Sequence, residues 1–178
     1  MIGRMEEGLE TDRADEMVDH VDENDRVIGR VTRADMRARR LRHRAVFVAV
    51  TDGSGRLLVH RRSTSKDIWP GWCDIAVGGV VASGEDYVAA AHRELAEEIG
   101  VGRAELSELD GGRPRVFDDE SVSLIGRCFQ VIHTGPFVFA DGEVAHAWWV
   151  DQEEFEQVRR SERFLPDSLA LVLPRIRW

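Results

Sequence analysis

Cysteine, lysine and long apolar runs are what this sequence of 178 residues has least of. Its two cysteines, Cys73 and Cys128, are too few for a disulfide framework, although a single disulfide between them stays open. The N-terminus lacks the basic-then-apolar order of a signal peptide, and a Cys-poor chain without one is typical of the reducing cytoplasm. No run approaches the roughly 20 apolar residues of a membrane span. We therefore expect a cytoplasmic protein without membrane association.

Positive charge is also scarce. The chain has 24 Lys and Arg against 33 Asp and Glu, a formal net charge of -9 that argues against a nucleic-acid polymer as partner. Lys66 is the only lysine, so the positive charge is almost entirely arginine. Residues 26–44 are arginine-dense and follow an acidic first stretch. Two interpretations stay open for this segment, a solvated surface that pairs with the acidic stretch or a surface that attracts phosphate.

The chain contains no internal repeat and no low-complexity linker. Hydrophobic residues make up 43% and charged residues 32%, which is the composition of a globular protein, and the length suits one domain. We expect a mobile acidic arm over residues 1–16 and a single domain over residues 17–178.

Apolar residues with period two, separated by turn-forming residues, predict several strands. Two hairpins are expected over residues 17–33 and 45–62, and further strands within 75–81, 106–109, 122–133 and 147–150. Helices are expected over residues 34–40, 86–99, 151–160 and 166–176, the last interrupted by Pro174. Strands interleaved with helices indicate an α/β fold, a sandwich of α/β/α type around a mixed β-sheet.

The predicted helix over residues 86–99 contains the most informative segment. We expect it to begin near Ser83 and to end at Gly100. Steps of three and four residues predict a buried face formed by Val88, Ala91, Leu95 and Ile99. Three carboxylates, those of Glu94, Glu97 and Glu98, share another face near the C-terminal end.

Clustered carboxylates are unfavourable at this end of a helix. Like charges at such spacing cost roughly 0.2–0.5 kcal/mol per pair, and the helix dipole adds about 0.3–1 kcal/mol for each. Arg93 can neutralise only part of the charge. A solvated acidic face is one explanation. A divalent cation is the other, because Mg²⁺ favours carboxylates, waters and substrate phosphates, and Gly78–Gly79 allows close backbone approach.

The segment resembles the Nudix box. That family pattern is Gly, five residues, Glu, seven residues, then Arg-Glu-apolar-any-Glu-Glu-any-Gly-apolar. Every specified position is matched, by Gly79, Glu85, Arg93, Glu94, Leu95, Glu97, Glu98, Gly100 and Val101. Nine fixed positions at fixed spacing make this a specific signal.

The resemblance implies Mg²⁺-dependent hydrolysis of a diphosphate linked to another group, with Mn²⁺ as a substitute metal. It makes Glu97 and Glu98 the principal metal ligands, assisted by Glu94 and the carbonyl of Gly79. The metal would polarise phosphoryl oxygens and lower the pKa of an attacking water.

The resemblance also assigns supporting roles. Arg93 and Glu85 would orient the carboxylates. The box contains no general base, which family members commonly draw from a loop before a late strand, and here that loop supplies Glu143.

Substrate contacts are expected from the segment before the box. Trp69 and Trp72 could form a stacking wall or simply cap the core. Arg61, Arg62 and Lys66 precede them and could bind phosphates or solvate the end of a strand.

A wider part of the chain is similar to the isopentenyl-diphosphate isomerase branch of the superfamily, which uses a Cys before the box and several metal-binding His residues. Here Gly78 stands at the position of that Cys and Val80 at that of a His. His43 matches another metal His, but the position of its partner falls near Met36.

The sequence therefore predicts a Mg²⁺-dependent pyrophosphohydrolase in which water attacks a phosphoanhydride of a small nucleotide-like diphosphate. The alternatives are isomerase activity and a nucleotide-binding module without turnover. A homodimer is one option for the oligomeric state.

Overall fold

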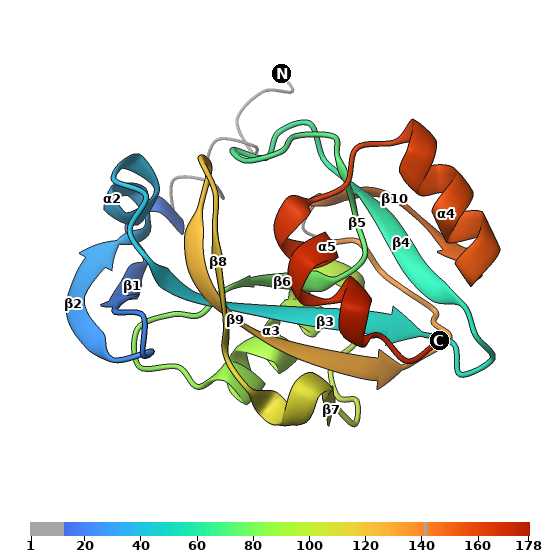
Figure 1. Cartoon of the computed structure of the whole chain (residues 1–178), viewed down its shortest axis with the longest axis horizontal. Helices are drawn as coiled ribbons and strands as arrows, with labels where there is room; N and C mark the ends of the chain where they lie inside the picture. The colour runs from blue at the N-terminus through green and yellow to red at the C-terminus, as the bar shows by residue number, and fades with distance from the viewer. Residues whose placement is uncertain (1–12, 141) are drawn as a thin grey trace, which may run out of the picture.

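The computed structural model of the chain describes residues 13–140 and 142–178, which form a mixed β-sheet flanked by helices (Figure 1). The strands of the described residues are β1 (Met17–Val21), β2 (Val27–Thr32), β3 (His43–Thr51), β4 (Leu57–Arg62), β5 (Cys73–Asp74), β6 (Val77–Val80), β7 (Ser107–Glu108), β8 (Arg115–Asp118), β9 (Ser123–Ile132) and β10 (Val144–Val150). The helices are α2 (Arg33–Ala38), α3 (Tyr87–Ile99), α4 (Gln152–Ser161) and α5 (Pro166–Leu171), with 3₁₀ turns η1 (Leu109–Gly112) and η2 (Leu173–Arg175). The α/β class expected from the sequence is confirmed.

Strand β3 is the centre of the sheet. It pairs antiparallel with β6 and parallel with β9, in register from His43↔Leu124 to Thr51↔Ile132. Strands β1 and β2 extend the sheet on one side, and β4 and β10 on the other. Since successive side chains of a strand point to opposite faces, β3 contributes to a core on each face of the sheet.

The two cores differ in the helices that cover them. Val46, Val48 and Val50 of β3 pack with Leu95 and Ile99 of α3. The alternate side chains, Ala45, Phe47 and Ala49, pack with Leu171 of α5 and Phe155 of α4. Figure 1 shows α5 in front of β3. Helix α3 is thus fixed against one face of the sheet, close to the glycine pair of β6.

Most expected elements are present, but their pairing could not be predicted. The hairpin over residues 45–62 closes at its turn, with Thr51 paired to Leu57, and then opens. Strand β4 continues antiparallel to β10 and β5, while β3 pairs with β6 and β9. The short strands β5 and β8 were not expected from the sequence, because each has too few residues to show an alternating pattern.

Helix α3 corrects two predictions. Its N-cap is Asp86, whose side chain accepts a hydrogen bond from the Ala89 N–H, whereas Ser83 donates its hydroxyl to Asp19. Val88 is 41% exposed, so its predicted place in the core is wrong. The buried face is rotated toward the row that contains Glu94 and Glu98, which are 3% and 4% exposed.

Other expectations concern the cysteines, the N-terminal arm and membrane association. Cys73 and Cys128 are both buried and free, so they do not form a disulfide. The expected arm lies outside the described residues as far as residue 12. Arg13 and Glu16, which follow, contact the domain. Over the described residues, no helix combines the length and apolarity that crossing a membrane requires.

Candidate active site

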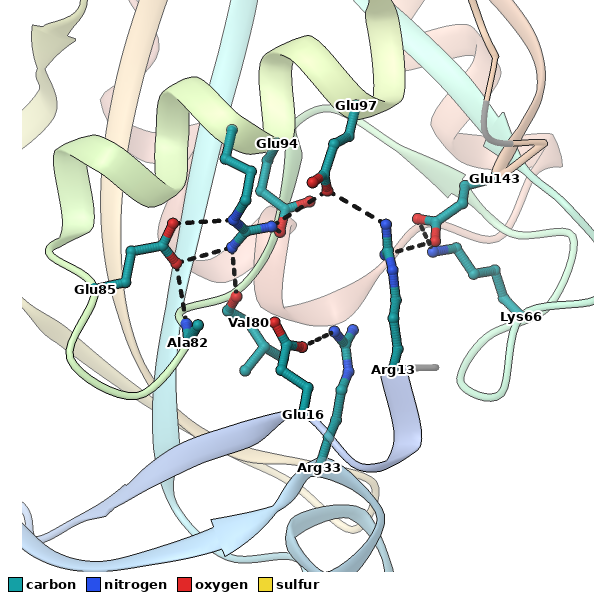
Figure 2. Close-up of polar contacts among 11 residues, drawn as sticks. Arg13, Glu16, Arg33, Lys66, Val80, Ala82, Glu85, Glu94, Glu97 and Glu143 are labelled. Atoms are coloured by element: carbon teal, nitrogen blue, oxygen red, sulfur yellow. Dashed lines mark hydrogen bonds and ion pairs between the residues drawn. The ribbon is translucent and has the colours of Figure 1, made fainter. Parts of the chain in front are cut away.

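The carboxylates of α3 meet beside the β6 strand, and one guanidinium joins them. Arg93 donates to both oxygens of Glu85 at 2.9 and 3.0 Å, to Glu94 at 2.6 Å and to Glu97 at 3.3 Å. It also donates to the Val80 carbonyl at 3.0 Å. Glu85, Glu94 and Glu97 point into one region in Figure 2. These hydrogen bonds, led by the one to Glu85, raise the pKa of Arg93 further above its usual value.

The three carboxylates of α3 differ in burial, and burial shifts the pKa values of Glu94 and Glu98. It raises the pKa of Glu94, although Arg93 opposes the shift, and it raises the pKa of Glu98 well above the usual value with Glu94 adding repulsion. Glu97 keeps 37% of its side chain exposed. Glu98 forms no hydrogen bond or ion pair with any residue in the described ranges, and Lys66 and Arg62 only partly offset its burial. A buried carboxylate without a direct partner is costly, which indicates a ligand.

The donor set fits a hard divalent cation. Oxygen donors are what Mg²⁺ prefers, and the backbone at Gly79 comes close to the cluster, because a Cβ there would lie 2.5 Å from Oε1 of Glu94. Within the described part of the chain, no three acidic, His or Cys side chains already form a metal-binding arrangement. The carboxylates are paired with arginines instead. Arg93 forms ion pairs with Glu94 and Glu97, and Arg13 forms a second ion pair with Glu97.

Glu143, the expected general base, lies across from Glu97. Arg13 bridges the two carboxylates, with Nη1 2.8 Å from Oε1 of Glu143 and Nη2 3.3 Å from Oε2 of Glu97. Lys66 also pairs with Glu143 (Figure 2). Burial alone would raise the pKa of Glu143, but Lys66 and then Arg13 outweigh it and lower the pKa. Glu143 is therefore an ionised carboxylate beside the cluster.

A cavity of about 90 Å³ adjoins Glu94 and Gly79. Three of the expected substrate-binding side chains line it, those of Arg62, Lys66 and Trp69. The other two lie outside its lining. Arg61 forms an ion pair with Glu162, with Nη2 2.9 Å from Oε1. Trp72 stacks on Trp69 with ring centroids 6.3 Å apart and lies under the guanidinium of Arg163.

The cavity also brings together residues that the sequence did not single out. Arg13, Arg33 and Arg37 add three guanidinium groups to its wall. Asp74 and Asp167 add two acids. The arginine-dense segment was the only available signal for Arg33 and Arg37. The two acids are 93 positions apart in the sequence, and nothing in their local pattern links them.

The positions that correspond to isomerase residues do not form an isomerase site. A Cβ at Gly78 would lie 2.0 Å from the backbone oxygen of Val46, so the paired β3 strand excludes a side chain there. His43 is buried, its ring nitrogen contacts the Leu41 carbonyl, and burial lowers its pKa to about 4. Met36 packs in a small core with Val18 and Val80.

Comparison with known proteins gives one consistent result. The NUDIX domain family matches residues 41–169. An uncharacterised Nudix hydrolase of Yersinia pestis is 42% identical over 154 residues, covering 86% of this chain and 82% of the relative. The uncharacterised Nudix hydrolase YfcD of Escherichia coli (strain K12) is 38% identical over 154 residues, with 86% and 83% covered. The crystal structure of DR0079 from Deinococcus radiodurans matches with a TM-score of 0.75 and 28% identity, covering 91% of this chain and all of that one.

The mixed sheet with a carboxylate-bearing helix on one face defines an α/β protein of the Nudix type. The chain belongs to the Nudix family. The relatives bear the name Nudix hydrolase, and the finer resemblance to the isomerase branch stays a prediction.

Proposed function

We propose that this protein is a cytoplasmic, Mg²⁺-dependent pyrophosphohydrolase that cleaves a phosphoanhydride bond of a small nucleotide-like diphosphate by attack of water. Membership of the Nudix family supports hydrolysis of a pyrophosphate-type bond. The observation that carries the proposal is the buried, unpartnered Glu98 beside Glu94 and Glu97, next to a cavity walled by arginine and lysine. This arrangement suits a cation on one side and phosphates on the other.

Each carboxylate has a distinct part in the proposal. Glu97 and Glu98 hold the metal, with Glu94 and the Gly79 carbonyl assisting. When bound, the metal supplies polarisation of the phosphoryl oxygens and a water of lowered pKa. Arg93 and Glu85 are positioning residues, since their paired hydrogen bonds anchor the loop before α3 to its middle turn.

Glu143 is the proposed general base. A base must be ionised before it accepts a proton, and Lys66 and Arg13 keep this carboxylate charged. Its ion pairs connect the base to the phosphate-binding wall, because Lys66 and Arg13 both line the cavity. Negative charge that develops on a substrate phosphate would attract Lys66 and Arg13. Their ion pairs with Glu143 would weaken, and the carboxylate could then accept a proton from water.

The cationic wall is the proposed diphosphate site. Arg33, Arg37 and Arg62 line the cavity together with Lys66. Arginine offers a planar fork of donors that matches phosphate oxygens. Arg62 donates to the Ile68 carbonyl at 3.2 Å, and its buried Nε has no partner among the described residues, so a donor remains available for a ligand.

Two alternatives have less support. Isomerase activity requires a thiol in front of the box, and the contact of Gly78 with the β3 backbone disfavours any side chain there. A binding module that used no metal would have no need for the unpartnered Glu98, whose burial costs stability.

The test is product release from a panel of nucleotides, sugar nucleotides, dinucleotides and isopentenyl diphosphate, each measured with Mg²⁺ and with EDTA. We expect cleavage of one class with Mg²⁺ and none with EDTA. Isomerised isopentenyl diphosphate, or cleavage that persists in EDTA, would contradict the proposal.

A further inference from the structure

Two acids line the cavity at a distance in sequence from the Nudix box. Asp74 lies in β5 and Asp167 in the first turn of α5. They are 5% and 6% exposed, and both line the cavity. The structure therefore brings two carboxyl groups to a site whose other charged wall residues are mostly cationic.

Neither acid is neutralised by an ion pair within the described ranges, despite the nearby arginines. Oδ1 of Asp74 accepts from the backbone N–H groups of Ile75 and Ala76, at 2.7 and 3.2 Å. Oδ1 of Asp167 accepts from the Ser168 N–H at 2.8 Å. These bonds use Oδ1 of each side chain. Oδ2 of Asp167 forms no hydrogen bond with the described residues, whereas the Ser168 side chain lies close enough to Asp74 to lower its pKa.

The two groups also influence one another. Burial raises the pKa of Asp74 to about 6, and the Ser168 side chain and Arg62 only partly oppose it. Burial and the neighbouring Asp74 raise the pKa of Asp167 to about 7. Near neutral pH the pair therefore holds a proton as well as negative charge. It can donate one hydrogen bond and accept others.

Such a pair costs the fold stability, because the burial of both acids outweighs the attraction of Arg62 and both are more favourable in the solvated, unfolded chain. Replacement by amides would keep the backbone hydrogen bonds without that cost. Perturbed acids in a cavity are more often found at functional sites than in structural positions. The cavity contains such groups near Arg37 and Arg62 of the phosphate-binding wall, so a base attached to a bound diphosphate could reach them.

The remaining wall is largely apolar. Phe47, Trp69, Ile68 and Leu165 line the same cavity. By the measure that gives about 90 Å³, one water takes about 10–15 Å³, so the space admits a single small ring system. Apolar and aromatic walls with a few convergent polar groups are typical of a site for a planar ring.

We propose that Asp74 and Asp167 are specificity-determining residues that hydrogen-bond the amino and ring-nitrogen edge of a heterocyclic base, so that the substrate is a diphosphate carrying an amino-substituted base. A carboxylic acid pairs with an amidine edge by donating to the ring nitrogen and accepting from the amino group. A carboxylate accepts two N–H groups from an edge that offers two donors. This inference rests on the proposed function only in placing the diphosphate on the cationic wall.

The experiment measures binding without turnover. The full-length chain is titrated calorimetrically in EDTA at pH 7 with cytidine, adenosine, guanosine and uridine diphosphates and with inorganic pyrophosphate. The same titrations follow with Asp74→Asn and Asp167→Asn. Glu162→Gln is the matched control, because it also converts an acid to an amide but pairs with Arg61 outside the cavity lining. Thermal unfolding checks that each variant is folded.

We expect at least one diphosphate with an amino-substituted base to bind tenfold or more tightly than both uridine diphosphate and pyrophosphate. Either Asn variant should reduce this ratio at least tenfold, while pyrophosphate binding and Glu162→Gln stay as in the wild type. Equal binding of all five compounds, or an unchanged ratio in both folded Asn variants, would overturn the base-reading role. Since Mg²⁺ is absent from the titrations, these outcomes are independent of whether the hydrolase assay succeeds.

Discussion

Gly79 and Glu94 lie so close together that a Cβ atom on the glycine would be 2.5 Å from Oε1 of the glutamate. The strand residue and the helix residue thus fit together only because one of them has no side chain. Glu94 cannot yield freely, since it is 3% exposed and hydrogen-bonded to Arg93 at 2.6 Å.

This contact predicts the effect of Gly79→Ala. The methyl group should displace the Glu94 carboxylate by about 1 Å, and such misplacement can cost roughly 10²-fold in rate. We expect kcat to fall by about that factor, and the free energy of unfolding to fall by about 1–3 kcal/mol because the added methyl group overpacks a buried site. Gly102→Ala is the control, because a Cβ there meets nothing within 4 Å. Unchanged kcat in Gly79→Ala would mean that the position of Glu94 is irrelevant to the reaction.

Arg93→Lys tests the guanidinium that joins the cluster. Lysine cannot reproduce the two parallel bonds to Glu85 or keep the further bonds to Glu94 and Val80. Since a hydrogen bond to a charged group is worth about 1.5–3 kcal/mol, we expect urea denaturation to show a loss of that order. Wild-type stability in the lysine variant would show that charge alone suffices and that the fork geometry does not matter.

Arg13 forms an ion pair with Glu97, so in the proposed site it would compete with the metal for that carboxylate. The Arg13–Glu97 pair is about one third exposed on both sides, and exposed pairs are worth about 0.2–1 kcal/mol. We expect Arg13→Gln to increase Mn²⁺ affinity by up to about fivefold, measured by titration followed with electron paramagnetic resonance. Arg103→Gln, on the exposed surface beyond α3, should leave the affinity unchanged. Weaker Mn²⁺ binding in Arg13→Gln would instead indicate that Arg13 orders the ligands.

The acid pair predicts how stability depends on pH. Asp74 and Asp167 have pKa values of about 6 and about 7 in the fold, against the usual 3.8. The folded chain therefore binds more protons than the unfolded chain between about pH 4 and 7, and these groups lower stability as pH rises through that range. Burial lowers the pKa of the nearby Arg37 only to about 10, so that side chain stays charged throughout this range.

Urea denaturation of Asp167→Asn and the wild type at pH 4.5 and 8 measures this effect. The variant should be more stable than the wild type at pH 8, by about 1 to a few kcal/mol, because a tenfold change in acid strength is worth about 1.4 kcal/mol. At pH 4.5 the difference should be small. The same difference at both values would show that Asp167 is not protonated preferentially in the fold.

The sequence predicted the fold and the carboxylate helix well, because both depend on local patterns. The predicted range of residues 86–99 matches α3 to within one residue, with Gly100 in the left-handed conformation at its end, although the cap expected near Ser83 was wrong. Periodicity was wrong about Val88, however, since the sheet against which a helix packs decides which rows of side chains are buried. Because the buried face of α3 is rotated from the predicted one, Glu94 and Glu98 are buried, although glutamate side chains usually lie on the surface.

The substrate cavity could not be predicted, because it is assembled from distant segments. Arg37, Arg62 and Asp167 come from α2, β4 and α5, and their meeting depends on the pairing of β3 with β9 and β6. Even among the predicted residues, Arg61 and Arg62 point to different places, as neighbours on a strand must. Sequence proximity therefore selected a segment of which only some side chains reach the cavity, those of Arg62, Lys66 and Trp69.

The most direct test of the central claim is Mn²⁺ binding by the wild type and by Glu98→Gln, followed by electron paramagnetic resonance and repeated with Mg²⁺ as competitor. Glu98 is buried and Glu105 exposed, so Glu105→Gln is the control for loss of one acid near the same helix. We predict a site in the wild type and in Glu105→Gln that Mg²⁺ displaces, and a loss of affinity of at least tenfold in Glu98→Gln, together with loss of Mg²⁺-dependent hydrolysis. Equal Mn²⁺ affinity in all three proteins would contradict the assignment of Glu98 as a metal ligand.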